Sequence, residues 1–341
     1  MNDSINIVVA GATGYVGLEL IKILSTHPKA NIKYLCAKKS IGKTIYSFDK
    51  KIKKRNLPKI SSIKRVKWKN IDLIFTALPN GEAQKIANQI NSNIKLIDLS
   101  GDFRIKNPLV YKKWYGKKHS CKNLIKKSIY SISEFNKKKL NQFKIISCPG
   151  CYPTSVQIPL IPLIKNKLIN LDNIIIDSKS GFSGAGKNLN KKFYFKNIYQ
   201  SVSAYGLGFH KHMPEIEQEL SKVAKRKIHV SFTPHLIPMF RGILSTIYLQ
   251  TRGNNTAKKL HLALKKYHKN NFFVKVAKFN SALGTGEVMN TNFCKISICE
   301  NRTKNKVIII SVIDNLIKGA SGQAVQNMNL AFGFRETLGL K

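Results

Sequence analysis

The fold of this chain is decided by the stretch Ile5-Asn6-Ile7-Val8-Val9-Ala10-Gly11-Ala12-Thr13-Gly14-Tyr15-Val16-Gly17. A short apolar, β-branched run ends at a glycine, and a helical pattern follows over Val16–Leu24. Gly11 can make the tight turn, Gly14 lets the backbone approach a pyrophosphate, and Gly17 permits close packing of helix on strand. The start of the helix then offers N–H groups and a positive dipole end to phosphates. The pattern predicts a dinucleotide site; the competing interpretation is a tight turn without a ligand. The residues expected to bind the cofactor are Gly11, Ala12, Thr13, Gly14, Tyr15, Val16 and Gly17.

The second predicted strand, Ile32–Cys36, indicates which dinucleotide is bound. An NAD site usually places Asp or Glu near the end of this strand, where it holds the ribose 2′-hydroxyl. The run Leu35–Ser40 contains no acid and instead supplies Lys38 and Ser40. These two side chains suit a 2′-phosphate, so we expect NADP(H), although Lys38 also fits a general excess of lysine.

Strands and helices alternate over residues 1–150 and change character afterwards. Alternation of short apolar strands with helices predicts a Rossmann-type, doubly wound parallel sheet. Two lysine-rich segments, 40–70 and 104–142, are weakly periodic excursions from it. After Pro153 longer strands with fewer helices predict a second α/β domain with a mixed or antiparallel sheet. The expected strands are Ile71–Leu78, Ile94–Leu99, Phe143–Ser147, Ile174–Asp177, Ile228–Phe232, Ile243–Gln250 and Lys306–Ile313, and the expected helices include Glu82–Ile90, Thr256–Lys269 and Gly319–Phe332.

The composition is strongly basic. The 341 residues carry a formal net charge of +42, with 51 lysines and eight arginines. One interpretation is a basic nucleic-acid-binding protein. We favour A/T-rich coding, because Lys, Ile and Asn are abundant together, the lysines are dispersed, and no RRM, KH or zinc-finger pattern is present. We therefore expect no specific nucleic-acid partner.

Apolar runs, the N-terminal residues and the cysteines bear on where in the cell the protein is located. No run approaches the ~20 apolar residues of a spanning helix, and the N-terminus lacks the basic start of a signal peptide. Six cysteines without a secretory signal suit a reducing compartment. We expect a cytoplasmic protein without a membrane partner.

The segment Ser147–Thr154 contains two cysteines where a strand ends and a helix begins. A thiol at a helix N-terminus is favoured as thiolate, and Cys151 is the nearer of the two to that terminus. Cys148 and Cys151 also match a redox pair, half of a zinc site, or two buried small hydrophobes. Cys294 and Cys299 lie five apart on a strand and point to opposite faces, which argues against zinc. We expect no metal.

A glycine-rich loop, Ala204–Glu215, carries His210 and His212. Histidine is the natural acid/base partner of a thiol near neutral pH. Arginine is rare in this chain, so Arg104 and Arg241 are candidates to clamp an anionic substrate with bidentate hydrogen bonds. A second loop, Ser180–Lys187, offers backbone N–H groups but lacks the spacing of an ATP-binding P-loop.

Taken together, these motifs resemble the N-acetyl-gamma-glutamyl-phosphate reductase family, whose reaction belongs to arginine biosynthesis. Pro149–Thr154 together with His210–Glu215 is the most specific part of the resemblance, which covers nearly the whole chain. It implies a Rossmann domain over 1–150, a catalytic and oligomerisation domain over 151–315, and a C-terminal helix over 316–341 that returns to the first domain. Other matching segments are Gly11–Gly17, Phe75–Gly81, Asp98–Arg104, Ser180–Lys187, Thr233–Thr246 and Asp314–Asn329.

The resemblance also implies an activity. Cys151 is expected to attack an acyl phosphate and form a thioester, which NADPH reduces to the semialdehyde. His212 is favoured over His210 as the acid/base, and the protein is expected to be a homo-oligomer, dimer or tetramer. Alternatives are an aspartate-semialdehyde or carrier-linked reductase, or the nucleic-acid-binding protein. Further expected contacts are Ser183, Gly184 and Asn315 for the cofactor and Arg104, Lys187, Tyr205 and Arg241 for the substrate.

Overall fold

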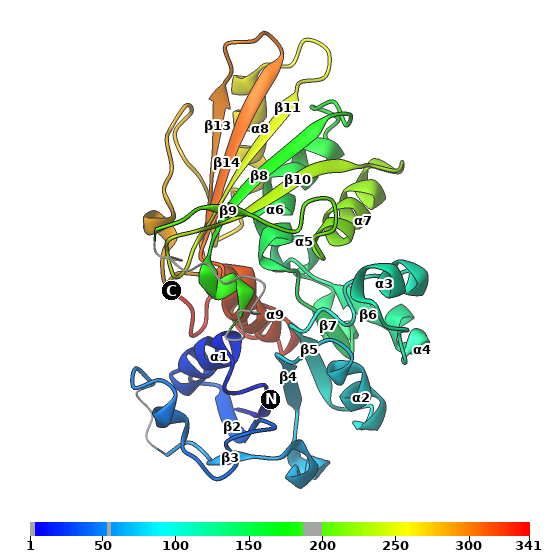
Figure 1. Cartoon of the computed structure of the whole chain (residues 1–341), viewed down its shortest axis with the longest axis vertical. Coiled ribbons are helices and arrows are strands. Elements are labelled where there is room, and N and C mark those ends of the chain that lie inside the picture. Colours follow the sequence, from blue (N-terminus) through cyan, green and yellow to red (C-terminus); the bar gives the residue numbers. More distant parts are fainter. Residues whose placement is uncertain (1–3, 53–55, 187–199) are drawn as a thin grey trace. The chain divides into compact units, whose positions relative to one another are not determined.

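The computed structural model describes residues 4–52, 56–186 and 200–341. The chain forms two compact units, drawn in Figure 1. Unit 1 comprises Met1–Pro149 and Ala320–Lys341, and unit 2 comprises Gly150–Gly319.

Unit 1 is built on a seven-stranded sheet in the order β3-β2-β1-β4-β5-β7-β6, and every pair in it is parallel. The chain proceeds outward from β1 in one direction and then from β4 in the other. The turn after β1 therefore lies at the point where the strand order reverses, which is where ligands bind in such sheets. The strands are β1 (Ile5–Ala10), β2 (Ala30–Cys36), β3 (Ile60–Ser61), β4 (Leu73–Thr76), β5 (Lys95–Asp98), β6 (Ser128–Tyr130) and β7 (Ile145–Ser147).

Both faces of this sheet are covered, which explains why its strands are apolar throughout. Along β1, Ile7 and Val9 belong to one core cluster, and Val8 belongs to the other. Helices α1 (Tyr15–Ser25) and α9 (Gly322–Ala331) contribute to the first cluster, and α2 (Glu82–Gln89) to the second. The doubly wound parallel sheet predicted from the sequence is confirmed.

The two lysine-rich excursions contain short elements that periodicity alone does not show. Helices of four to eight residues give too few turns for a recognisable apolar stripe. The elements are α3 (Pro108–Tyr115), α4 (Lys122–Lys126), α5 (Ser133–Asn136) and 3₁₀ turns at Ile45–Ser47, Ile63–Arg65, Trp68–Asn70 and Leu140–Gln142.

Unit 2 contains a second seven-stranded sheet, in the order β12-β13-β14-β11-β8-β10-β9. Strand β8 pairs in parallel with β10 and antiparallel with β11, so the sheet is mixed, as predicted. The strand expected at Ile228–Phe232 begins at Val230 and continues to Ile237. The strands are β8 (Ile174–Gly181), β9 (Ser203–Ala204), β10 (Val230–Ile237), β11 (Ile243–Gln250), β12 (Val274–Val276), β13 (Cys294–Glu300) and β14 (Lys306–Ile313).

Three helices pack on one face of the unit 2 sheet (Figure 1). They are α6 (Cys151–Lys165), α7 (Met213–Ala224) and α8 (Ala257–Tyr267). The central helix, α6, is buried over Tyr152–Ile164 and contacts both α7 and α8. On the opposite face the side chains are more open; Ile175 and Tyr248 are 46% and 39% exposed.

The end of unit 2 differs from the expected continuous helix Gly319–Phe332. Residues Ile317–Ser321 form a π-helical turn, and the α-helix begins only at Gly322. Such π-turns are frequent at functional sites.

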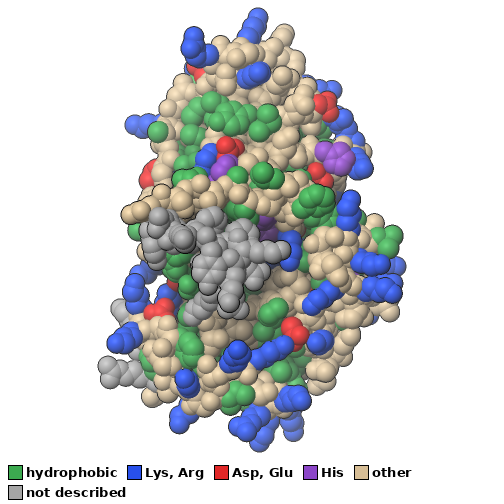
Figure 2. All heavy atoms as spheres, in the orientation of Figure 1, with side chains coloured by type: hydrophobic (Ala, Val, Ile, Leu, Met, Phe, Trp, Pro, Cys, Tyr) green, Lys and Arg blue, Asp and Glu red, His purple; other side chains and the backbone are tan. Residues whose placement is uncertain are grey.

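Basic side chains are scattered over the visible face of the protein in Figure 2. None of the helices in the described part of the chain has the length and apolarity that a membrane crossing requires.

Candidate active site

The glycine turn of unit 1 lies between β1 and α1, and its three glycines have different structural roles. Gly11 has φ +92°, and a Cβ there would lie 2.1 Å from the carbonyl oxygen of Ala77. A Cβ on Gly17 would lie 2.1 Å from the carbonyl oxygen of Gly11. These two glycines are required by the fold itself, because no side chain fits at either position.

Gly14 differs, because a Cβ there would meet nothing closer than the Gly11 carbonyl oxygen at 3.6 Å. Gly14 is the N-cap of α1 and makes no side-chain capping bond to the first turn. The position combines open space with a helix N-terminus that has a positive dipole end. The turn therefore fits the diphosphate of a dinucleotide.

Lys38 and Ser40 follow β2, as the cofactor prediction requires. The Lys38 side chain is 74% exposed, and its Nζ lies 3.2 Å from Oε2 of Glu82, the first residue of α2. Sequence reasoning missed this partner because Glu82 is 44 residues away. An exposed pair of this kind contributes at most about 1 kcal/mol, so Lys38 can exchange Glu82 for a phosphate.

Arg104 is fixed inside unit 1. It is 8% exposed; its Nε donates to the carbonyl oxygen of Cys148 at 2.8 Å and Nη2 to that of Leu99 at 2.9 Å. The guanidinium thus holds the end of β7, directly before the segment that leads to Cys151. Cys148 is buried among core residues, as expected for a small hydrophobe, and burial raises the pKa of its thiol to about 12.

Cys151 is the first residue of α6 in unit 2. Its N-cap is Gly150, which has no side chain to bond the free N–H groups of the first turn. Cys151 is half-buried, and it opens a helix of 15 residues. A nucleophile at this position experiences the full positive end of the helix dipole.

His212, the N-cap of α7, and Glu215 in the first turn of that helix pack directly against this helix start. A Cβ on Gly150 would lie 2.3 Å from Nε2 of His212, so the imidazole ring lies on the bare α-carbon of Gly150. The backbone N–H of Gly150 donates to Oε2 of Glu215 at 2.9 Å. The other carboxylate oxygen lies 3.9 Å from His212 Nε2, and Glu215 is fully buried. The residue before the thiol is therefore held by both members of a His–carboxylate pair.

His210 has different surroundings. Its Nδ1 accepts a hydrogen bond from the backbone N–H of His212 at 3.1 Å. Its ring makes edge contacts with Tyr152, Tyr205 and Phe232, with centroids 5.3–5.4 Å apart. Burial lowers the pKa of His210 to about 4, so its ring is neutral at physiological pH. The His210 ring is neutral and its Nδ1 already accepts a backbone hydrogen bond, so it is better suited to holding His212 in place than to acting as the acid/base.

Tyr205 lies beside the same cluster. Its hydroxyl donates to the hydroxyl of Tyr152 at 3.0 Å, and the Tyr152 hydroxyl donates to the carbonyl oxygen of His235 at 3.4 Å. Burial raises the pKa of both phenols, so both stay protonated. They are neutral hydrogen-bonding groups next to Cys151.

The second glycine loop closes on the segment after β10. Asn315 joins the two: its Nδ2 donates to Oγ of Ser183 at 3.0 Å, and its Oδ1 accepts from the N–H of Gly242 at 2.7 Å. A Cβ on Gly184 would lie 3.1 Å from Oγ of Ser180. Ser183, Gly184 and Asn315 thus lie close together, and their contact with the cofactor stays a prediction. Lys187 lies outside the described residues.

Arg241 lies next to Gly242 in the same region, and its guanidinium already has two protein partners. Its Nη1 lies 3.1 Å from Oδ2 of Asp314 and donates to Oδ1 of Asn290 at 2.7 Å. Asp314 and Glu215 are both fully buried carboxylates. The resemblance implied that Asp314–Gly319 lies near the nicotinamide, but nothing in the sequence indicated the pairing of Asp314 with Arg241, and sequence reasoning did not place Glu215 in the site.

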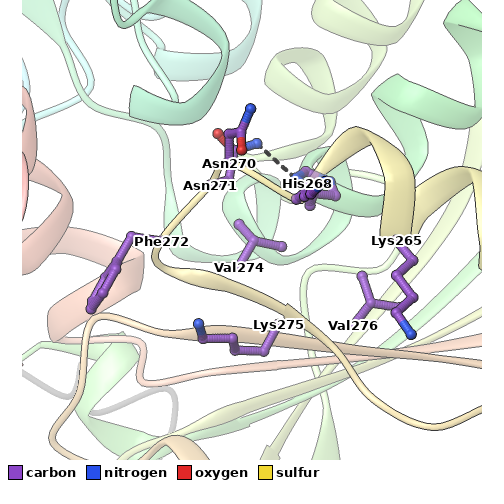
Figure 3. A pocket seen from close by; sticks show the side chains of 9 residues that line it. Lys265, His268, Asn270, Asn271, Phe272, Val274, Lys275 and Val276 are labelled. Carbon is purple, nitrogen blue, oxygen red and sulfur yellow. Dashed lines mark hydrogen bonds between the residues drawn. The ribbon is translucent and has the colours of Figure 1, made fainter.

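Two other features lie apart from these residues. A hollow of about 400 Å³ lies between the end of α8 and β12, where Figure 3 shows Lys265, Lys275 and Phe272 around it. It contains none of the predicted site residues. In the described ranges no group of three or more His, Cys, Asp or Glu side chains is placed to hold a metal ion.

Comparisons with known proteins agree with the two-part organisation. Residues 6–143 match the family model "Semialdehyde dehydrogenase, NAD binding domain", and residues 151–315 match "Semialdehyde dehydrogenase, dimerisation domain". Among solved structures, aspartate semialdehyde dehydrogenase II of Vibrio cholerae superposes with a TM-score of 0.72 at 17% identity, covering 97% of this chain and 98% of the other. The enzyme of Candida albicans, solved with NADP, has a TM-score of 0.68 at 16% identity, covering 96% and 98%. At such identities these structures show a shared fold.

Curated relatives are much more similar in sequence. The N-acetyl-gamma-glutamyl-phosphate reductase of Ehrlichia canis is 42% identical, covering 100% of this chain and 98% of the relative. A probable chloroplastic N-acetyl-gamma-glutamyl-phosphate reductase of Arabidopsis thaliana is 41% identical, covering 98% of this chain and 84% of the relative. The family inferred from the cysteine and histidine motifs is therefore confirmed: this chain belongs to the N-acetyl-gamma-glutamyl-phosphate reductase family.

Proposed function

We propose that the protein reduces N-acetyl-L-glutamyl 5-phosphate to N-acetyl-L-glutamate 5-semialdehyde and phosphate, with NADPH, as a step of arginine biosynthesis. The observation that carries the proposal is the placement of Cys151 at the start of α6, next to the His212–Glu215 pair of α7. The names of the full-length relatives point to the same reaction.

In this proposal unit 1 binds the cofactor and unit 2 carries the chemistry. The glycine turn takes the diphosphate, with Gly14 leaving room for it. Lys38 and Ser40 take the 2′-phosphate, which favours NADP(H), the cofactor present in the Candida albicans structure. Ser183, Gly184 and Asn315 form a polar loop cluster that is suited to the nicotinamide end.

The covalent step uses Cys151 and His212. The imidazole takes the thiol proton, and the thiolate attacks the acyl carbon. The new S–C bond forms while the C–O bond to phosphate breaks, and the phosphate leaves with the electron pair. The imidazolium holds a proton where it can neutralise the departing oxygen. A thioester on Cys151 remains.

The reductive step then releases the product. NADPH, when bound, supplies the hydride for the thioester carbonyl. The resulting oxyanion collapses as the C–S bond breaks, and Cys151 leaves as thiolate. The helix dipole of α6 stabilises this thiolate as leaving group, as it did the nucleophile.

Glu215 and His210 orient His212 in this scheme. A buried carboxylate beside an imidazole fixes the orientation of the ring. His210 accepts the backbone N–H of His212, and its neutral ring packs against the aromatic side chains around it. We therefore assign the acid/base role to His212 and a supporting role to His210.

For the substrate, Tyr205 offers a neutral hydrogen bond close to the thiol, and Lys187 is proposed for an anionic group. Arg104, whose Nε and Nη2 donate to the carbonyl oxygens of Cys148 and Leu99, is assigned to supporting the end of β7 instead. We also propose a homo-oligomer that uses the open face of the unit 2 sheet, in keeping with the family's dimerisation domain. Six free cysteines suit a reducing, cytosol-like compartment.

The experiment is phosphate-dependent NADP reduction, with N-acetylglutamate semialdehyde and aspartate semialdehyde supplied separately. We expect absorbance growth at the NADPH band with the first substrate only. Growth with aspartate semialdehyde only would keep the mechanism and reject the substrate. No growth with either, in protein that binds NADPH, would reject the proposed function.

A further inference from the structure

We propose that Arg241 acts as a positioning residue for Cys151 and does not bind the substrate: through Asp314 it holds the turn whose Gly319 abuts the cysteine side chain. The inference rests on the proposed role of Cys151 as nucleophile. It differs from the expectation that Arg241 clamps an anionic end of the substrate.

The first link is the engagement of the guanidinium. Nη1 of Arg241 lies between Oδ2 of Asp314 at 3.1 Å and Oδ1 of Asn290 at 2.7 Å. The Arg241 side chain is 12% exposed, and its guanidinium carbon lies 5.8 Å from the centre of the Phe240 ring. An arginine that clamps a substrate directs its planar fork to the ligand, whereas this one directs Nη1 into the protein.

The second link is Asp314, a fully buried carboxylate that accepts hydrogen bonds from two separate segments of the chain. Its Oδ2 also accepts the N–H of Asn290 at 2.8 Å. Its Oδ1 accepts the N–H groups of Leu316 at 2.9 Å and Ile317 at 3.2 Å. A carboxylate buried in this way needs a counter-charge, and Arg241 supplies it.

The third link is the turn that follows. The backbone N–H of Gly319 donates to the carbonyl oxygen of Asp314 at 2.9 Å, closing a turn over residues 314–319. Lys318 is fully buried, and its ammonium lies 5.7 Å from the centre of the Phe273 ring. The turn is thus fixed from its first residue and from the core, which leaves Gly319 little freedom to move.

The last link is the contact of Gly319 with the nucleophile. A Cβ on Gly319 would lie 2.7 Å from Cβ of Cys151 and 3.2 Å from its Cα. Both atoms belong to or adjoin the backbone of α6, so they cannot swing away as a side-chain tip would. The bare α-carbon of Gly319 therefore forms a wall behind the thiol.

Loss of the Arg241–Asp314 pair should relax this wall and displace the thiol. Misplacement of a reacting group by about 1 Å can reduce a rate by roughly 100-fold. Because binding of the acyl phosphate does not depend on the wall, kcat should fall with little change in KM.

The test compares Arg241→Met, Arg241→Lys, Asp314→Asn and Gly319→Ala with the exposed control Arg302→Met. Three quantities are measured: kcat, KM for the acyl phosphate, and the rate at which iodoacetamide alkylates the Cys151 peptide in substrate-free protein, followed by mass spectrometry. Circular dichroism and urea unfolding report whether each variant is folded.

We expect Arg241→Met and Asp314→Asn to lower kcat by about 10- to 100-fold while KM changes less than about threefold. Alkylation of Cys151 should slow in parallel, Arg241→Lys should recover part of both losses, and Arg302→Met should match the wild type. A rise in KM of tenfold or more for Arg241→Met, with wild-type alkylation, would assign Arg241 to the substrate and overturn the inference. Unchanged kinetics would also overturn it.

Gly319→Ala keeps the inference testable if the Arg241 or Asp314 variants fail to fold. It leaves the ion pair intact and should show the same loss of kcat and slower alkylation; wild-type behaviour would refute the wall. If no acyl phosphate is reduced even by wild-type protein, the proposed function fails, while the alkylation rates still decide whether Gly319 and Arg241 position the thiol.

Discussion

The substitution Gly150→Ala tests the geometry of the site with a single methyl group. In the structure an added Cβ would lie 2.3, 2.6 and 2.7 Å from three atoms of the His212 ring, Nε2, Cδ2 and Cε1. Ordinary van der Waals contact begins at about 3.4 Å, so Nε2 of the ring must move about 1.1 Å away from the added Cβ. The backbone of Gly150 is extended, with φ −67° and ψ 160°, and therefore tolerates alanine.

The expected effect is large on catalysis and small on folding. The ring is a side chain that can move, so the variant should fold. A shift of about 1 Å in a general acid/base costs roughly 100-fold in rate, close to 2.7 kcal/mol of transition-state stabilisation. Binding of NADPH should be unaffected, because neither Gly150 nor His212 is among the residues proposed to contact the cofactor.

The assay is steady-state NADPH oxidation with N-acetylglutamyl phosphate, with urea unfolding measured in parallel. Gly286→Ala is the matched control, because a Cβ at that position of unit 2 meets nothing within 4 Å. We expect kcat to fall about 100-fold in Gly150→Ala and to stay at the wild-type level in Gly286→Ala. A Gly150→Ala enzyme with wild-type kcat would refute the assignment of His212 to the reaction.

Three further predictions follow from the site. The pKa of His210 is about 4 in the folded chain, against 6.5 when the ring is exposed, so the unfolded chain binds more protons between these two pH values. The contribution of this ring to the free energy of unfolding is therefore highest above pH 6.5. It falls by about 3 kcal/mol as the pH drops toward 4. His210→Asn, which keeps an acceptor for the backbone N–H of His212, should lose less stability between pH 7 and pH 4.5 in urea unfolding than the wild type; equal losses would contradict the assignment. Gly14→Leu should raise the NADPH dissociation constant at least tenfold with near-normal stability. Gly17→Ala should instead lower the unfolding temperature of unit 1 in thermal unfolding, because its Cβ would collide with the backbone of Gly11. Lys38→Ala should weaken NADPH more than NADH in fluorescence titrations, and equal weakening would remove Lys38 from the 2′-phosphate site.

Much of the fold was predictable because local sequence patterns determine it. The run from Ile5 to Gly17 contains a strand, a turn that only glycine can make, and a helix start within thirteen residues. Cys151 and His212 were expected in the site for a similar reason, since each lies within two residues of a Gly or Pro where a helix begins.

The remaining features depend on contacts between residues far apart in the chain. Glu215 reaches Gly150 across 65 residues, and Arg241 reaches Asp314 across 73. No periodicity or composition encodes such pairs, so Arg241 was interpreted as free for a substrate. The pairing of Lys38 with Glu82 was missed for the same reason.

The central claim is that Cys151 forms a covalent bond to the substrate, and trapping that bond tests it most directly. Wild-type protein is mixed with N-acetylglutamyl phosphate without NADPH, quenched in acid and digested for mass spectrometry. We predict an N-acetylglutamyl group on the Cys151 peptide and one phosphate released per chain, with neither in Cys151→Ser. Phosphate release without this adduct, or an adduct on another cysteine, would contradict the account.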